Sequence, residues 1–178
     1  MDALIIVDLQ ESSFRDDRYH DQDAVIERIE RLAKFVRSAG GAIVFVQHDG
    51  TEEEGLLPFT PGWQILASLT REERDLVVRK TTNDAFLGTS LDHRLRELGA
   101  ARLIVCGWAT DFCVDSTIRA AISRAYRVVV VSDGHTAADR PHLSAAGVVA
   151  YHNWLWPRLL TPADPVTVLP AAALLAVT

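Results

Sequence analysis

Stretches of apolar residues alternate along this chain with segments whose apolar residues recur at helical spacing. The apolar stretches are short and rich in β-branched residues, which predicts strands buried on both faces. They cover residues 3–7, 42–46, 76–78, 103–105, 128–131 and 166–168. The helical pattern covers residues 24–39, 91–98, 113–125 and 143–156. Gly40 and Gly99 follow two of these segments, where helix C-caps commonly stand.

The order of these elements predicts the fold class. Strands that alternate with helices imply right-handed crossovers between parallel strands, with helices on both faces of the sheet. We therefore expect a three-layer α/β/α, Rossmann-like fold with a mainly parallel sheet of about six strands. No internal repeat or Pro/Gly-rich linker interrupts residues 1–178, which we expect to form a single domain. The longest irregular segment, residues 48–69, carries apolar side chains and is expected to be a lid or an interface element.

The composition argues against several classes of partner. Hydrophobic residues make up 48% of the chain, and the formal net charge is −6. The basic residues are scattered, which argues against binding to nucleic acid or to an anionic membrane surface. The apolar runs are too short to span a bilayer, and the first strand begins directly after Asp2, without a basic leader. We expect a cytoplasmic protein.

Three reactive side chains follow the predicted strands. Asp8 follows the first, Lys80 the third, and Cys113 lies at the turn from the fourth strand to the next helix. The carboxyl ends of parallel strands form the edge at which such folds bind ligands. A thiol at a helix N-terminus is expected to be shifted toward thiolate. Each residue alone has an ordinary explanation, but all three at one edge favour a catalytic site. Cys106, inside an apolar run, is expected to be a core residue.

Three motifs in this order resemble those of the isochorismatase-like cysteine hydrolases. They are Asp8 to Gln10 with Phe14, Lys80 to Thr89, and Gly107 to Cys113, and the resemblance extends from Ala3 to about Thr136. It implies a triad in which Cys113 is the nucleophile, Asp8 the general base or proton shuttle, and Lys80 the cation that orients Asp8 and favours the thiolate. The implied reaction is hydrolysis of a C–N bond in a small amide, ureido or carbamoyl compound. It would proceed through a covalent thioester-type intermediate, without a cofactor.

The resemblance also implies features of the backbone and the pocket. A cis peptide bond between Trp108 and Ala109 would aim the amides of Ala109 and Cys113 at one point and form an oxyanion hole. The residues expected to contact substrate are Gln10, Phe14, His48, Trp63, Trp108 and Phe112.

His48 bears on the question of a metal. Nicotinamidases, one branch of this family, hold a metal near this strand end with an Asp and several His residues. In this chain no second His lies near His48, so we predict no metal site, and nicotinamide is disfavoured as substrate. The presence of Cys113 disfavours a true isochorismatase, which lacks a cysteine at this position.

Two other hypotheses stay open beside that of a cysteine hydrolase. The first is a catalytically silent module that keeps the fold for binding or assembly. The second is a nucleotide-binding oxidoreductase, but the segment after the first strand lacks the Gly-x-Gly-x-x-Gly phosphate cradle. Large apolar residues near the C-terminus predict a homo-oligomer. They are Trp154, Leu155, Trp156, Leu159 and Leu160.

Overall fold

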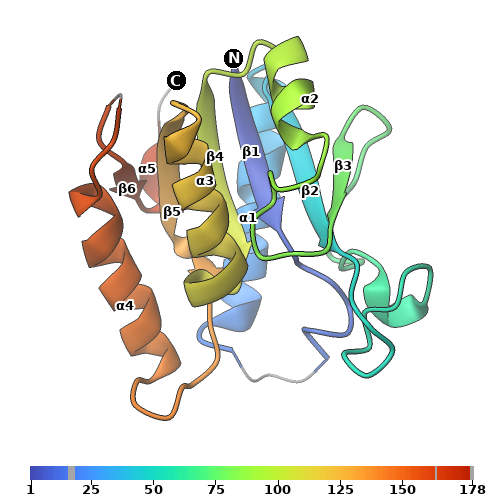
Figure 1. Ribbon diagram of the computed structural model, residues 1–178. Coiled ribbons are helices and arrows are strands. Elements are labelled where there is room, and N and C mark those ends of the chain that lie inside the picture. Colours follow the sequence, from blue (N-terminus) through green and yellow to red (C-terminus); the bar gives the residue numbers. More distant parts are fainter. Residues whose placement is uncertain (16–18, 163, 177–178) are drawn as a thin grey trace.

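A computed structural model describes residues 1–15, 19–162 and 164–176, and a parallel sheet forms its centre (Figure 1). Within these residues the sheet has six strands in the order β3-β2-β1-β4-β5-β6. The strands are β1 (Asp2–Val7), β2 (Ala42–His48), β3 (Leu76–Lys80), β4 (Arg102–Trp108), β5 (Arg127–Thr136) and β6 (Thr167–Leu169). All neighbouring strands pair in parallel. The predicted α/β fold is confirmed.

Helices cover both faces of the sheet (Figure 1). They are α1 (Gln22–Ser38), α2 (Leu91–Glu97), α3 (Asp115–Ser123), α4 (Ala145–Leu155) and α5 (Ala171–Leu175). Helices α1 and α5 pack on one face, where Leu4 and Ile6 of β1 join their core. The core on the other face contains residues of α2 and α3 together with Ile5 and Val7. Because β1 is buried on both sides, its sequence is continuously apolar instead of alternating.

Three elements differ from the prediction. Strand β5 continues to Thr136, because its polar end still pairs with β4 and His135 lies opposite Gly107. The predicted strand is shorter because it is based on the apolar run alone. A single π-helical turn, Thr110–Val114, precedes α3, so Cys113 lies in this turn and not at the start of a regular helix. Helix α5 is only five residues long, too short for helical periodicity to reveal.

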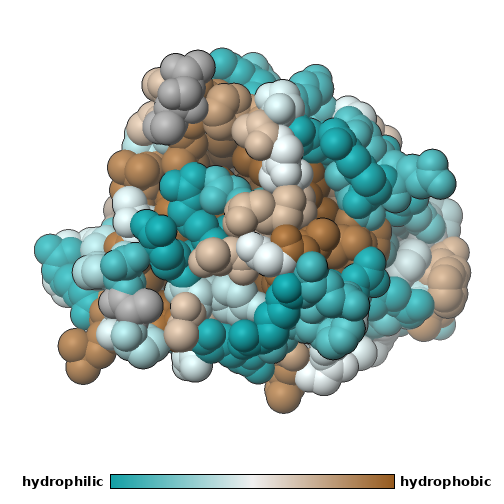
Figure 2. Space-filling model, turned by 90° about the horizontal axis from the view of Figure 1, so that it is seen from above, coloured by the Kyte–Doolittle hydropathy of each residue, from teal (hydrophilic) through white to brown (hydrophobic). Residues whose placement is uncertain are grey.

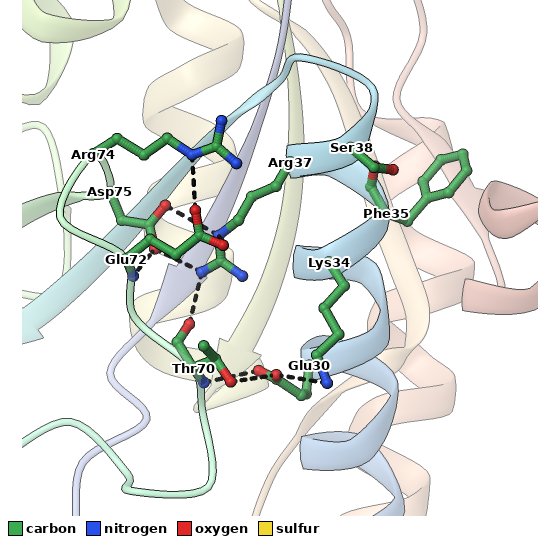
Figure 3. Close-up of polar contacts among 9 residues, drawn as sticks. All are labelled: Glu30, Lys34, Phe35, Arg37, Ser38, Thr70, Glu72, Arg74 and Asp75. Atoms are coloured by element: carbon green, nitrogen blue, oxygen red, sulfur yellow. Dashed lines mark hydrogen bonds and ion pairs between the residues drawn. The ribbon is translucent and has the colours of Figure 1, made fainter.

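A polar cluster fixes α1 against the segment that leads into β3 (Figure 3). Arg37 donates to both carboxylate oxygens of Asp75, at 3.2 and 2.6 Å, and to the carbonyl of Thr70 at 2.6 Å. Glu30 accepts hydrogen bonds from the amide and the hydroxyl of Thr70. The Arg37 and Asp75 side chains are only 4% and 2% exposed. This cluster therefore holds the start of β3, whose other end carries Lys80.

The end of the molecule at which β1 begins is seen from above in Figure 2, where apolar residues gather around a hollow. A cavity of about 370 Å³ lies at this end, lined by residues of α1, β4, β5 and β6. Asp8, Lys80 and Cys113 do not line it, so this cavity is separate from the candidate site.

No helix in the described part of the chain has the length and apolar character needed to cross a membrane.

Candidate active site

Three strand ends bring Asp8, Lys80 and Cys113 together at the carboxyl edge of the sheet. Asp8 directly follows β1, Lys80 ends β3, and Cys113 lies in the turn after β4. The Lys80 ammonium reaches past β2 and contacts both partners. Its Nζ lies 2.6 Å from Asp8 Oδ2 and donates to Cys113 Sγ at 3.2 Å. A third bond, to the carbonyl of Thr82 at 3.0 Å, fixes the ammonium.

Burial dominates the electrostatics of this group. The Lys80 and Asp8 side chains are 0% and 3% exposed, and Cys113 is 8% exposed. Burial raises the pKa of Asp8, while the Lys80 charge acts in the opposite direction. Burial likewise raises the pKa of Cys113 to about 12, with a further contribution from the Asp8 charge and opposition from Lys80.

The pKa of Cys113 is thus raised, contrary to the expected shift toward thiolate. The loss of hydration outweighs the neighbouring ammonium, so the resting side chain is a thiol at neutral pH. A buried thiol needs a base in order to attack, and the Asp8 carboxylate lies beside it. Asp8 Oδ1 is buried and has no hydrogen-bond partner among the described residues, so it is available as a proton acceptor.

The backbone before the nucleophile passes unusually close to β1. The peptide bond between Trp108 and Ala109 is cis, and Gly107 has a φ of +122°. A Cβ at Gly107 would lie 2.2 Å from the carbonyl oxygen of Val7. Only glycine fits at this position, both for its φ and for the contact with β1.

Two side-chain contacts hold the turn that carries Cys113. The Thr110 hydroxyl lies 2.9 Å from the Thr136 carbonyl oxygen and 2.9 Å from His135 Nδ1. Burial lowers the pKa of His135 to about 4, so this histidine is neutral. Arg140 donates two hydrogen bonds to Asp111, at 2.7 and 2.9 Å. Arg140 follows β5 in a stretch without a motif, so no sequence pattern selects it.

A cavity of about 350 Å³ opens in front of Cys113. Four of the residues expected to contact substrate line it: Gln10, His48, Trp108 and Phe112. Sequence reasoning missed six others, Ser12, Ser13, Tyr19, Glu54, Leu56 and Asn83. Asn83 belongs to the Lys80–Thr89 motif, and its Oδ1 lies 3.6 Å from Cys113 Sγ. The motif could have revealed this residue, whereas no pattern marks Glu54.

Gln10 lines the cavity, but its amide is already occupied. Its Oε1 accepts a hydrogen bond from the His48 amide at 2.8 Å, and its Nε2 donates to the carbonyls of His48 and Trp63, at 3.0 and 2.8 Å. These bonds tie the end of β1 to the end of β2. Gln10 therefore helps to position the site as well as lining the cavity.

Phe14 and Trp63, also expected to contact substrate, are not among the residues that line the cavity. The Phe14 ring packs on Trp108, with 6.4 Å between the ring centroids. The Trp63 indole donates to Asp49 Oδ1 at 2.9 Å and packs against the Arg79 guanidinium. The Phe14 ring thus supports Trp108 at the edge of the cavity, while the Trp63 ring contacts residues outside the lining.

The irregular segment 48–69 forms one wall of the cavity. Its backbone is hydrogen-bonded to residues 9–12 after β1, including Glu11 N to Gln64 O and Ser12 N to Gly62 O. This pairing brings Glu54 and Leu56 of the same segment to the cavity. The segment is therefore built into the site.

His48 also lines this cavity. Burial and the Lys80 charge lower its pKa, so the imidazole is neutral at neutral pH. In the described ranges, no three His, Cys, Asp or Glu side chains come together as metal ligands.

Comparisons with known proteins agree with this geometry. The isochorismatase domain family matches residues 2–153. A streptothricin hydrolase of Streptomyces noursei is 36% identical over 140 residues, which cover 78% of this chain and 56% of that protein. A ureidoacrylate amidohydrolase of Methylorubrum extorquens is 30% identical, over 86% of this chain and 78% of that protein. The chain thus spans about half the length of the streptothricin hydrolases that it matches.

The structure has close counterparts as well. An isochorismatase from Pseudomonas putida KT2440 superposes with a TM-score of 0.86 at 28% sequence identity, covering 97% of this chain and 89% of the other. The agreement therefore includes the region after residue 153, beyond the match to the domain family.

Proposed function

The chain belongs to the isochorismatase family, and on this premise we propose that it hydrolyses a C–N bond in a small amide, ureido or carbamoyl compound. The observation that carries the proposal is the Lys80 ammonium, which bridges the Asp8 carboxylate and the Cys113 thiol in front of a cavity. Two relatives are named for hydrolysis of this kind, a streptothricin hydrolase and a ureidoacrylate amidohydrolase.

The proposed reaction begins with proton transfer from Cys113 to Asp8. As the proton leaves, Sγ bonds to the substrate carbonyl carbon and the carbonyl π electrons move to oxygen. The amides of Ala109 and Cys113 would donate to this oxyanion. Collapse of the tetrahedral adduct breaks the C–N bond. The leaving nitrogen takes the proton from Asp8, and a thioester on Cys113 remains.

Water completes the cycle. Asp8 removes a proton from a water molecule, whose oxygen attacks the thioester carbon. Collapse of the second adduct breaks the C–S bond, and the sulfur recovers its proton from Asp8. Lys80 compensates the carboxylate charge while Asp8 is ionised, and it faces the sulfur while Cys113 is ionised. The same carboxyl thus acts as base and acid in each half of the reaction.

The test compares ammonia release from amide, ureido and carbamoyl compounds by the wild type and by Cys113→Ala. Cys106→Ala is the matched control, because Cys106 is buried in the core and should be dispensable for the reaction. We expect Cys113→Ala to abolish turnover while Cys106→Ala retains it. Mass spectrometry of the quenched wild type should detect an acyl adduct on Cys113.

Turnover near the wild-type rate in Cys113→Ala would refute the mechanism. A catalytically silent binding or assembly module predicts that no compound is turned over by the wild type and that no adduct forms.

We also propose that the chain self-associates through the outer face of α4. Tyr151 and Trp154 are half-exposed there, and their ring centroids lie 5.9 Å apart. Trp156 does not contribute, which corrects one member of the predicted set: it is fully buried and donates to Asp115 Oδ1 at 2.8 Å. Light scattering should give a dimeric or larger mass that falls for Trp154→Arg, and a monomeric wild type would contradict this proposal.

A further inference from the structure

We propose that the cavity selects substrates that carry a positive charge and discriminates against those that carry a carboxylate, and that Glu54 provides this selection. This inference rests on the proposed function, since it assigns a substrate class to the same site.

Glu54 gives the cavity a charge that no described residue compensates. Among the described residues two carboxylates line the cavity, Asp8 and Glu54, and the Lys80 ammonium neutralises Asp8. Among the described residues no cation forms an ion pair with Glu54. Its Oε2 accepts hydrogen bonds from the amide and the hydroxyl of Thr51, at 2.7 and 3.0 Å. These bonds lower the pKa of Glu54, so the carboxylate is ionised at neutral pH.

The described residues of the lining supply no cation to offset this charge. Within the described part of the chain, neither a lysine nor an arginine lines the cavity. His48 faces Glu54 closely enough to sense its charge, but burial and Lys80 lower the pKa of this histidine and keep it neutral. With Asp8 and Lys80 cancelling each other, the lining carries a net negative charge from Glu54.

Two guanidinium groups of the neighbouring segments are engaged elsewhere. Arg140 is bound to both carboxylate oxygens of Asp111, and Arg79 is paired with Asp49 at 2.6 Å. Arg15 lies beside Gly62, outside the lining. Among the described residues that line the cavity, a carboxylate on a substrate would therefore meet a like charge and no basic side chain.

Aromatic side chains complete a surface suited to a cation. Tyr19, Trp108 and Phe112 line the cavity, and the faces of such rings attract positive charge. Phe112 already holds a cation in this way, since the Arg140 guanidinium lies 5.1 Å from its ring centroid. An ionised glutamate together with aromatic walls is a combination that favours an ammonium or amidinium group.

The test uses three amides of nearly equal length: 6-aminohexanamide, hexanamide and adipic acid monoamide. They differ at one end, which is an ammonium, a methyl group or a carboxylate. Calorimetry measures their binding to Cys113→Ala, which retains the cavity but lacks the nucleophile, at low and at high salt. Because Glu54 is exposed, we expect only about tenfold tighter binding of the ammonium than of the carboxylate compound at low salt.

Variants at position 54 identify the source of the preference. Glu54→Gln, in the same Cys113→Ala background, keeps an oxygen that can accept from Thr51 and should remove most of the difference. Glu54→Lys should reverse it. Glu53→Gln is the matched control, because Glu53 is exposed on the same turn but does not line the cavity, and it should leave the preference intact.

Three results would overturn the proposal: equal binding of the three compounds, a preference that survives Glu54→Gln, or no binding of the ammonium compound. Failure of the proposed function is a separate result. In that case the wild type releases no ammonia from any compound, while the order of affinities is unchanged.

Discussion

Replacing Asp8 with asparagine should move two properties of Cys113 in opposite directions. Asp8→Asn preserves the shape of the side chain but removes its charge and its ability to accept a proton. Hydrolysis should fall by about a thousandfold or more, because the buried thiol loses its base. Alkylation of the same thiol by iodoacetamide should become faster, because the negative charge of Asp8 contributes to the raised pKa of Cys113.

The structure sets the size of the second effect. Lys80 Nζ lies 2.6 Å from Asp8 Oδ2 and 3.2 Å from Cys113 Sγ, so the oxygen and the sulfur are at most 5.8 Å apart. At an effective dielectric constant of about 20, two unit charges at this distance interact by about 3 kcal/mol. This energy corresponds to about two pKa units. The pKa of Cys113 should therefore fall from about 12 to roughly 10.

The assay is the rate of alkylation at pH 8, followed by mass spectrometry of the Cys113 peptide. The thiolate fraction at this pH should rise about a hundredfold. The thiolate of lower pKa is also a weaker nucleophile, so alkylation should accelerate about tenfold. Cys113→Ser serves as the background, since burial also raises the pKa of Cys106. An unchanged alkylation rate in Asp8→Asn would refute the reasoning, because it would mean that Asp8 carries no charge in the resting protein. A fall in both rates would indicate a distorted site.

Three further substitutions test the framework of the site. Arg37→Ala leaves the buried Asp75 carboxylate without its partner (Figure 3). It should lower the free energy of unfolding in urea by about 3–5 kcal/mol; a loss below about 1 kcal/mol would show that the pair is not buried in solution. Gly107→Ala places a Cβ 2.2 Å from the Val7 carbonyl oxygen and should destabilise the fold by more than about 3 kcal/mol, so a melting temperature equal to the wild type would contradict the φ of +122°. Thr110→Val removes the hydroxyl that contacts His135 and the Thr136 carbonyl, and kcat should fall about tenfold while the circular dichroism spectrum is unchanged. An unchanged kcat would show that this hydroxyl does not position the nucleophile.

The strands, and the edge of the sheet at which the three reactive residues lie, could be predicted from the sequence because the patterns that indicate them are local. The strands β1 and β4 are continuous apolar runs, and each is followed by polar residues that end the run. Once the strands are known to be parallel, Asp8, Lys80 and Cys113 must lie at one edge of the sheet. Their meeting at hydrogen-bond distance depends on the length of the lysine side chain, which reaches from β3 past β2 to the ends of β1 and β4.

The lining of the cavity could not be predicted in the same way, because segment 48–69 is positioned by partners far away in the sequence. Its backbone pairs with residues 9–12, and this pairing brings Glu54 to the cavity and keeps Trp63 outside it. The pKa of Cys113 is also inaccessible to local reasoning. A helix N-terminus and a lysine suggest a thiolate, but the degree of burial depends on the packing of the whole site.

A high pKa and a reactive thiol are compatible once the net charge of the buried group is considered. In the resting state the Asp8 carboxylate and the Lys80 ammonium cancel, and the Cys113 thiol is neutral. Loss of the thiol proton to solvent would leave a net negative charge in a buried site, which is the reason for a pKa of about 12. Transfer of the same proton to Asp8 keeps the net charge at zero, because the new thiolate then faces Lys80 across 3.2 Å. Burial thus suppresses ionisation without suppressing attack, provided that Asp8 and Lys80 are both present.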